Sequence, residues 1–143
     1  MNFYAAIKEY EHADVNSKLE NASKHDFIKI VLEELSKNLK SLKYAIENEG
    51  KLSKTKSKSF ARIITSLTVL TSSLDFKNGE PIASNLFNLY DFCRREVLDS
   101  YKNLTTKGID DSINVIDDIL SAWKEIAWFF LEILKISLIN SIL

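Results

Sequence analysis

The sequence predicts an all-α protein: an antiparallel four-helix bundle with a short N-terminal helical cap and an apolar C-terminal extension. Apolar residues recur at alternating steps of three and four along four long segments, and no comparable period of two is present. The 143 residues include only 3 glycines and 1 proline, so few residues favour turns. Helices that each carry one apolar stripe and are joined by short connections pack antiparallel around a shared core.

The first two predicted helices cover residues 23–49 and 54–75. Ser23 is a candidate N-cap for the first helix and Gly50 a candidate stop, while Asn78-Gly79 breaks the pattern after the second. The apolar stripe consists of Ile28, Leu32, Leu35, Leu39, Leu42 and Ile46 in the first helix, and of Phe60, Ile63, Leu67, Leu70 and Leu74 in the second.

The third predicted helix starts near Pro81, a position where the missing backbone N–H costs nothing. Gly108 and Asp110 are expected to separate it from the fourth helix. The stripe continues through Ile82, Leu86, Leu89, Tyr90, Cys93, Val97 and Tyr101 in the third helix, and through Ile113, Ile116, Leu120, Trp123, Ala127, Phe130 and Leu134 in the fourth.

The pattern divides the chain into an N-terminal cap segment (residues 1–22), a helical bundle (residues 23–126) and an apolar helical extension (residues 127–143). A fourth helix that continues into the extension would be about 50 Å long, against about 40 Å for the first. The extension is apolar on nearly all sides, so we expect it to bend back, to pair with another chain or to occupy a groove. Its shortness, together with Glu132 and Lys135, disfavours a membrane span.

Composition and charge exclude several classes of function. The net charge of −1 gives no whole-protein argument for a nucleic-acid or membrane partner. A single cysteine, Cys93, excludes an internal disulfide framework and suits a reducing compartment. The N-terminus lacks a cationic region followed by an apolar core, so we expect no secretory signal and a cytoplasmic location.

The residues that carry chemistry are few, which predicts a protein that is not an enzyme and needs no cofactor. His12 and His25 are the two histidines, and Glu9 with His12 matches only half of a ligand pair of the di-iron bundles. The predicted interior is otherwise aliphatic, so no metal site is expected. Cys93 falls on an apolar stripe without an adjacent histidine, which predicts a buried, inert thiol.

Two groups of charges need an interpretation. The pairs Asp110-Asp111 and Asp117-Asp118 are interpreted as solvent-facing residues that complement a helix dipole. The basic run leaves two interpretations open, a solvated helix start or a contact with a phosphate or an acidic partner. It consists of Lys51, Lys54, Lys56, Lys58 and Arg62.

The second half of the chain contains a series of short motifs: Ser73-Leu74-Asp75, Gly79, Ile82-Ala83-x-Asn85-Leu86, Leu89-Tyr90-Asp91-Phe92, Arg95, Val97-Leu98 and Ala122-Trp123-Lys124-x-Ile126. In these motifs the chain resembles the FliS family, the flagellar export chaperones of flagellin. Upstream, Ala22-Ser23 before Phe27-Ile28 and Ile7-Lys8-x-Tyr10 are similar to the start of the family pattern. The chain departs from that pattern with Lys24 in place of proline, Glu80-Pro81 in place of Gly-Glu and Tyr101 in place of asparagine.

The resemblance implies a protein that binds the disordered C-terminal segment of flagellin, blocks its polymerisation and delivers it to the export gate. It implies that Ile7 and Tyr10 belong to a mobile cap over one groove. It also implies that the client binds at Asn85, Leu86, Leu89 and Tyr90.

An alternative is an adaptor bundle that does not bind flagellin and self-associates through its C-terminal tail. The tail ends in Ser137-Leu138-Ile139-Asn140-Ser141-Ile142-Leu143, similar to the aliphatic-serine ending of flagellin. A further hypothesis is therefore that the tail folds back into a client groove until flagellin displaces it.

Overall fold

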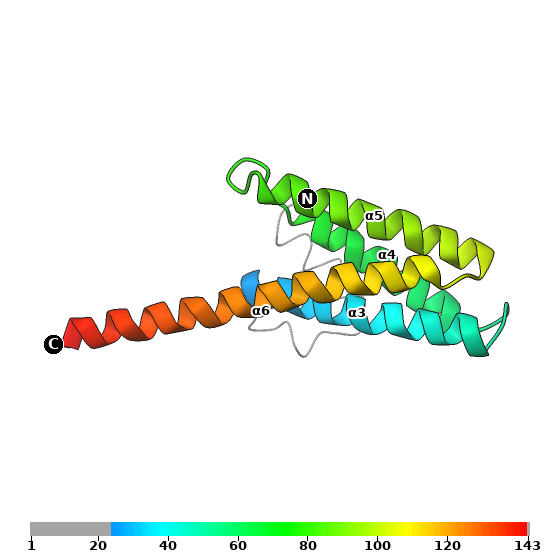
Figure 1. The fold of residues 1–143 in the computed structure, drawn as a ribbon, viewed down its shortest axis with the longest axis horizontal. Helices are drawn as coiled ribbons and strands as arrows, with labels where there is room; N and C mark the ends of the chain where they lie inside the picture. The colour runs from blue at the N-terminus through cyan, green and yellow to red at the C-terminus, as the bar shows by residue number, and fades with distance from the viewer. Residues whose placement is uncertain (1–23, 143) are drawn as a thin grey trace.

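The structure is a computed structural model that describes residues 24–142, with side chains through residue 126. It contains four helices in the described residues: α3 (Lys24–Asn48), α4 (Lys54–Ser72), α5 (Ile82–Asn103) and α6 (Lys107–Ile142). Successive helices run antiparallel, and α6 closes the bundle by packing on α3 (Figure 1). The all-α bundle is therefore confirmed, while the predicted N-terminal cap lies outside the described residues.

The core is built mainly on α3, which packs against both α4 and α6. Its predicted stripe is buried from Ile28 to Leu42, and Phe27 and Val31 widen it. Burying one such side chain contributes about 1.5–3 kcal/mol, so the stripe is the main stabilising feature of the bundle. The remaining helices add Ile63, Leu67, Val69, Leu70, Tyr90, Cys93, Val97, Ile109 and Ile116.

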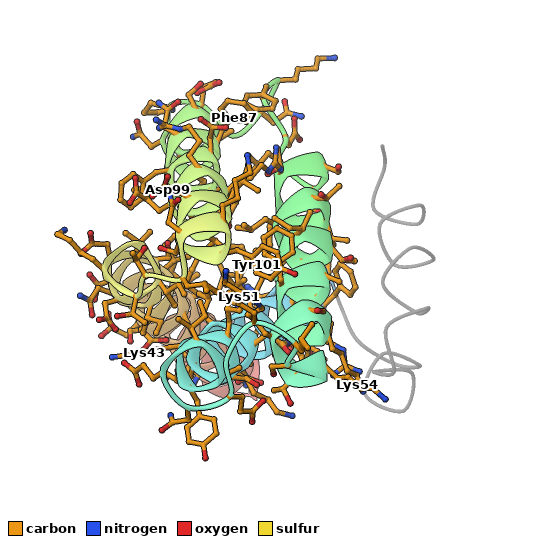
Figure 2. The ribbon with its side chains drawn as sticks, turned by 90° about the vertical axis from the view of Figure 1, so that its right-hand side faces the viewer. Lys43, Lys51, Lys54, Phe87, Asp99 and Tyr101 are labelled. Carbon is orange, nitrogen blue, oxygen red and sulfur yellow. The ribbon has the colours of Figure 1, made fainter. Side chains whose placement is uncertain are left out.

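A row of polar contacts joins α3 to α6 along the outside of this core. Asp117 accepts a hydrogen bond from the Ser36 hydroxyl at 2.6 Å and lies 3.3 Å from Lys40 Nζ. Lys43, labelled in Figure 2, lies 2.7 Å from Asp110, which raises the pKa of the lysine. Asp110 lies in the first turn of α6, as the dipole interpretation expects, but Asp110 and Asp117 are only partly exposed and also contact α3.

The helix ends follow local hydrogen bonds. Gly50 adopts a φ of 74° just after α3, a left-handed conformation that favours glycine and ends the helix as predicted. The Ser53 side chain accepts a hydrogen bond from Lys56 N and caps the start of α4. The predicted end of the second helix near residue 75 is wrong, since α4 stops at Ser72.

The separation of the last two helices also differs from the prediction. Gly108 lies inside α6, and the break falls earlier, at Leu104, whose left-handed backbone (φ 55°) ends α5. A Cβ on Gly108 would lie 2.8 Å from the Glu96 backbone oxygen and 2.7 Å from the Ser100 hydroxyl. The glycine is therefore required by the close approach of two helices, a cause that the sequence pattern does not reveal.

Of the four pairs of neighbouring helices, α4 and α5 share the least extensive contact. At one end the Phe60 and Tyr101 rings stack with centroids 4.0 Å apart, and Lys56 Nζ lies 5.2 Å from the Tyr101 centroid. Figure 2 shows Tyr101 directed into the space between the two helices. The pocket described below lies at the opposite end of this pair.

Helix α6 continues well past the rest of the bundle (Figure 1). With 36 residues it is about 54 Å long, against about 37 Å for the 25 residues of α3. The backbone crosses residue 127 without a break, so the tail is a continuation of α6 and does not bend back over the bundle. Over the residues that the structure describes, no helix is long and apolar enough to cross a membrane.

Replacing Gly108 with alanine tests the close approach of α5 and α6. Helix propensity alone predicts a gain of up to about 1 kcal/mol for Gly108→Ala, and less than that in the first turn of α6. The clash with the Glu96 backbone predicts the opposite, a loss of about 1–3 kcal/mol in the free energy of unfolding. Urea denaturation followed by circular dichroism measures the difference. Asn114→Ala, at an exposed position of the same helix, is the control; a stabilised Gly108→Ala protein would contradict the proposed packing.

Candidate functional site: an apolar pocket at one end of the bundle

An open apolar pocket lies at the end of the bundle from which α6 projects. Its volume is about 340 Å³. All four helices contribute: the start of α3, the end of α4 with the residues that follow it, the first half of α5, and one aromatic side chain of α6. The lining residues are Lys24, His25, Ile28, Leu70, Ser73, Leu74, Leu86, Tyr90 and Trp123.

One wall of the pocket is a stacked pair of rings. The His25 and Trp123 centroids lie 4.8 Å apart with an interplanar angle of 16°. The Trp123 indole Nε1 donates a hydrogen bond to the His25 backbone oxygen at 3.0 Å, which fixes the position of α6 relative to the start of α3. His25 Nε2 is buried and has no hydrogen-bond partner among the described residues.

The opposite wall depends on the turn between α4 and α5. The Asp75 carboxylate accepts hydrogen bonds from the backbone N–H groups of Lys77 and Asn78, both at 3.0 Å. These bonds, with one from the Asn78 side chain, lower the pKa of Asp75. Gly79 allows the turn to close, because a Cβ there would lie 2.6 Å from the Asp75 backbone oxygen. The turn thus brings Leu74 and α5 to the same cavity.

The structure brings together only part of the predicted client site. Leu86 and Tyr90 line the pocket, with Leu86 partly exposed and Tyr90 almost fully buried. Asn85 and Leu89 are exposed on α5 and do not line it. Ile7 and Tyr10, predicted for the cap, lie outside the described residues.

The turn after α4 and the first half of α5, which supply Leu74 and Leu86 to the pocket, also carry exposed apolar side chains. Phe76 in the turn and Phe87 on α5 make an edge-to-face contact with centroids 6.1 Å apart. Both are more than 40% exposed, and Ile82 and Leu89 are exposed nearby in the sequence of α5. Exposed apolar surface next to a concave site is typical of a protein-binding surface.

Burial keeps two titratable groups of α5, Cys93 and Tyr90, in their neutral forms. Burial raises the pKa of the Cys93 thiol to about 11, and it also raises the pKa of Tyr90. Neither group is a nucleophile at neutral pH, which agrees with an inert cysteine. Within residues 24–126, whose side chains are described, no cluster of three or more potential metal ligands occurs. The pocket lining itself is mostly aliphatic and aromatic.

The sequence pattern did not reveal several lining residues. No sequence motif marks His25 as a wall residue, and Lys24 stands out only as a departure from the family pattern. Trp123 was placed on an apolar stripe, yet its ring packs on a side chain 98 residues earlier in the chain. A long-range pair of this kind leaves no periodic signal, so only the tertiary structure reveals it.

Comparison with known proteins identifies the family. The family described as flagellar protein FliS matches residues 6–128 of this chain. The chain belongs to the FliS family. The flagellar secretion chaperone FliS of Vibrio cholerae (serotype O1, El Tor Inaba) is 27% identical over 121 residues, which are 85% of this chain and 88% of that protein. The protein of the same name from Salmonella typhimurium (strain LT2) is 28% identical over 123 residues, 86% of this chain and 90% of its own length.

The FliS match ends near the point where α6 leaves the bundle. Residues 129–143, the last part of the apolar extension, lie beyond it. The pocket lies entirely within the matched region. The expected resemblance is thus confirmed for the bundle, while the end of the tail is a feature that the family pattern does not cover.

The buried thiol gives the protein a pH-dependent stability. The unfolded Cys93 ionises near its ordinary pKa of 9.0, whereas the folded thiol stays protonated up to about pH 11. The unfolded state therefore binds fewer protons in this range, and stability falls as the pH rises. From about pH 8 to about pH 10.5, the wild type should lose roughly 2 kcal/mol more than Cys93→Ala in urea denaturation. Parallel slopes for the two proteins would contradict a thiol held neutral by burial.

Proposed function

We propose that this FliS-family chain is an export chaperone that binds the disordered C-terminal segment of flagellin in its apolar pocket. The observation that carries the proposal is an open pocket lined by Leu70, Leu74, Leu86 and the stacked His25 and Trp123 rings. Such a site serves binding rather than catalysis. The proposal includes a cytosolic location and delivery of the bound client to the flagellar export gate.

The geometry suits an amphipathic helix that folds as it binds. A client helix presents apolar anchors at steps of three and four, and such anchors can be buried in an apolar pocket. Ordering a disordered segment costs about 2–5 kcal/mol, which burial of several aliphatic anchors offsets. Phe76, Phe87 and Ile82 give such a helix further apolar surface beside the pocket. Occupation of the anchors also blocks the contacts through which the client would polymerise.

A pair of leucine substitutions on one helix tests the role of the pocket. Leu86 lines the pocket, whereas Leu98 is exposed farther along α5 and outside it. Calorimetric titration with a peptide of the flagellin C-terminal segment should show binding weakened about 5- to 30-fold by Leu86→Ala, because burial of the leucine side chain is lost.

The matched control in this test is Leu98→Ala, which should bind the peptide within about twofold of the wild type. Equal effects of the two substitutions would assign the client to another surface. A complete absence of peptide binding by the wild type would contradict the proposed function itself.

A second candidate function is self-association through the C-terminal extension, as in an adaptor bundle. The helical continuation of α6 beyond the bundle favours it, because the sequence there is apolar on nearly all sides. Light scattering should then show an oligomer for the full chain and a monomer for a chain that ends at residue 126. A monomeric full chain would contradict this candidate without affecting the pocket.

A further inference from the structure

A second surface, different in character from the pocket, lies at the other end of α3 and α4. This basic groove has a volume of about 410 Å³ and contains four basic side chains and no acidic ones. It uses the second half of α3 and the start of α4, whereas the apolar pocket uses the start of α3 and the end of α4. The groove is lined by Lys37, Asn38, Ser41, Lys54, Thr55, Lys58, Ser59 and Arg62.

The floor of the basic groove is polar and ordered. Asn38 and Ser59 are only 6% and 4% exposed. The Ser59 hydroxyl donates to the Ser41 hydroxyl oxygen at 3.0 Å, and the Asn38 amide donates to the Glu34 backbone oxygen at 2.8 Å. Buried amide and hydroxyl groups at the base of a cationic groove suit a polar ligand and disfavour an apolar one.

Several lysines lie at the N-terminal end of α4, where the helix dipole is also positive and repels them. The first turn of α4 carries no acidic residue, and Lys54, Lys56 and Lys58 lie near the N-terminal, positive end of its dipole. Lys56 turns away, with its Nζ near the Tyr101 ring. Lys54 projects outward from the first turn of α4, as Figure 2 shows. This arrangement destabilises the free helix and favours an anionic partner.

Other lysines of α3, outside the basic groove, form ion pairs with α6. Lys40 and Lys43, on the next face of α3, are paired with Asp117 and Asp110. Lys37, Lys54 and Lys58 take part in no ion pair with any described residue. Three lysines of the basic groove therefore have no counter-ion among the described residues, unlike Lys40 and Lys43.

We infer that the basic groove binds an acidic helical segment of a partner protein, at a site separate from the apolar pocket. Lys54, Lys58 and Arg62 follow each other at steps of four and form a row about 12 Å long on one side of α4. Carboxylates at the same step on a partner helix match this row. A nucleic acid fits less well, because the chain carries a net charge of −1 and no aromatic side chain lines the groove for base stacking.

This inference goes beyond the proposed function and does not depend on it. Because the two surfaces lie at opposite ends of the α3–α4 pair, an acidic partner and an apolar client can be bound at the same time. The protein would then link a client to a second component through charge, and that link would weaken with salt.

The test uses the full chain and a fluorescent synthetic helical peptide with glutamate at every fourth position. The groove variant is Lys54→Gln/Lys58→Gln, and the matched control is Lys77→Gln/Lys102→Gln, which removes two exposed lysines elsewhere. Fluorescence anisotropy at low salt should show peptide binding weakened about tenfold or more by the groove variant, and within about twofold of the wild type for the control. Added salt should weaken wild-type binding.

Thermal unfolding shows whether the groove variant is folded. Loss of two lysines from the positive end of the α4 dipole should leave the melting temperature unchanged or raise it. Weakened binding by a folded variant therefore supports the inference. Equal weakening by the control variant would overturn it, as would wild-type protein that does not bind the glutamate peptide.

Two further measurements show which kind of ligand the basic groove binds. A single-stranded DNA oligonucleotide of equal charge that binds tighter than the peptide would overturn the assignment to a protein partner. The chain's own N-terminal carboxylates are tested with full-length Glu9→Gln/Glu11→Gln. If this variant binds the peptide about tenfold tighter than the wild type, the basic groove belongs to the chain's own segment and the inference fails.

Discussion

The packing of α3 against two neighbours is the constraint on which the rest of the structure depends. Its stripe from Phe27 to Leu42 is buried by α4 on one side and by α6 on the other. The contacts of Ser36, Lys40 and Lys43 with two aspartates then fix α6 in register. The fourth helix, α5, makes a more extensive contact with α6 than with α4. The apolar pocket exists because that last contact is incomplete.

The two candidate binding surfaces lie at opposite ends of the α3–α4 pair, and the side chains at each end determine their character. At one end the tight Asp75 turn brings Leu74 and Leu86 to an open apolar pocket that Trp123 also lines. At the other end, small polar side chains replace the aliphatic ones, and lysines surround them. One face is suited to burial of apolar groups and the other to charge. Neither presents a reactive nucleophile or a cluster of metal ligands within the described side chains.

The helices could be predicted from the sequence because they depend on a local signal. The steps of three and four predicted the stripe of α3, which the structure confirms from Ile28 to Leu42. Glycines were less reliable signals: Gly50 ends a helix, whereas Gly108 lies inside one because α5 approaches too closely for a side chain. Helical spacing reports which residues share a face but carries no information on how near a neighbouring helix will come.

The pocket was only partly predictable. Leu86 and Tyr90 were expected from the family resemblance and do line it, whereas Asn85 and Leu89 share their helix but face elsewhere. The stack of His25 on Trp123 joins residues far apart in the chain and was not expected. The basic run between Lys51 and Arg62 leaves two interpretations open, and the structure adds that Lys37 of α3 lines the same groove as Lys54 and Lys58.

The central claim is that a client helix lies in the apolar pocket, and Trp123 reports on it directly. Its indole N–H is hydrogen-bonded to the His25 backbone inside the pocket wall, so its NMR resonance is sensitive to occupation of the cavity. Titration with a peptide of the flagellin C-terminal segment should shift the Trp123 indole and Leu86 methyl resonances together, and both shifts should saturate at the same peptide concentration. Saturable binding that leaves both resonances unmoved would contradict the account.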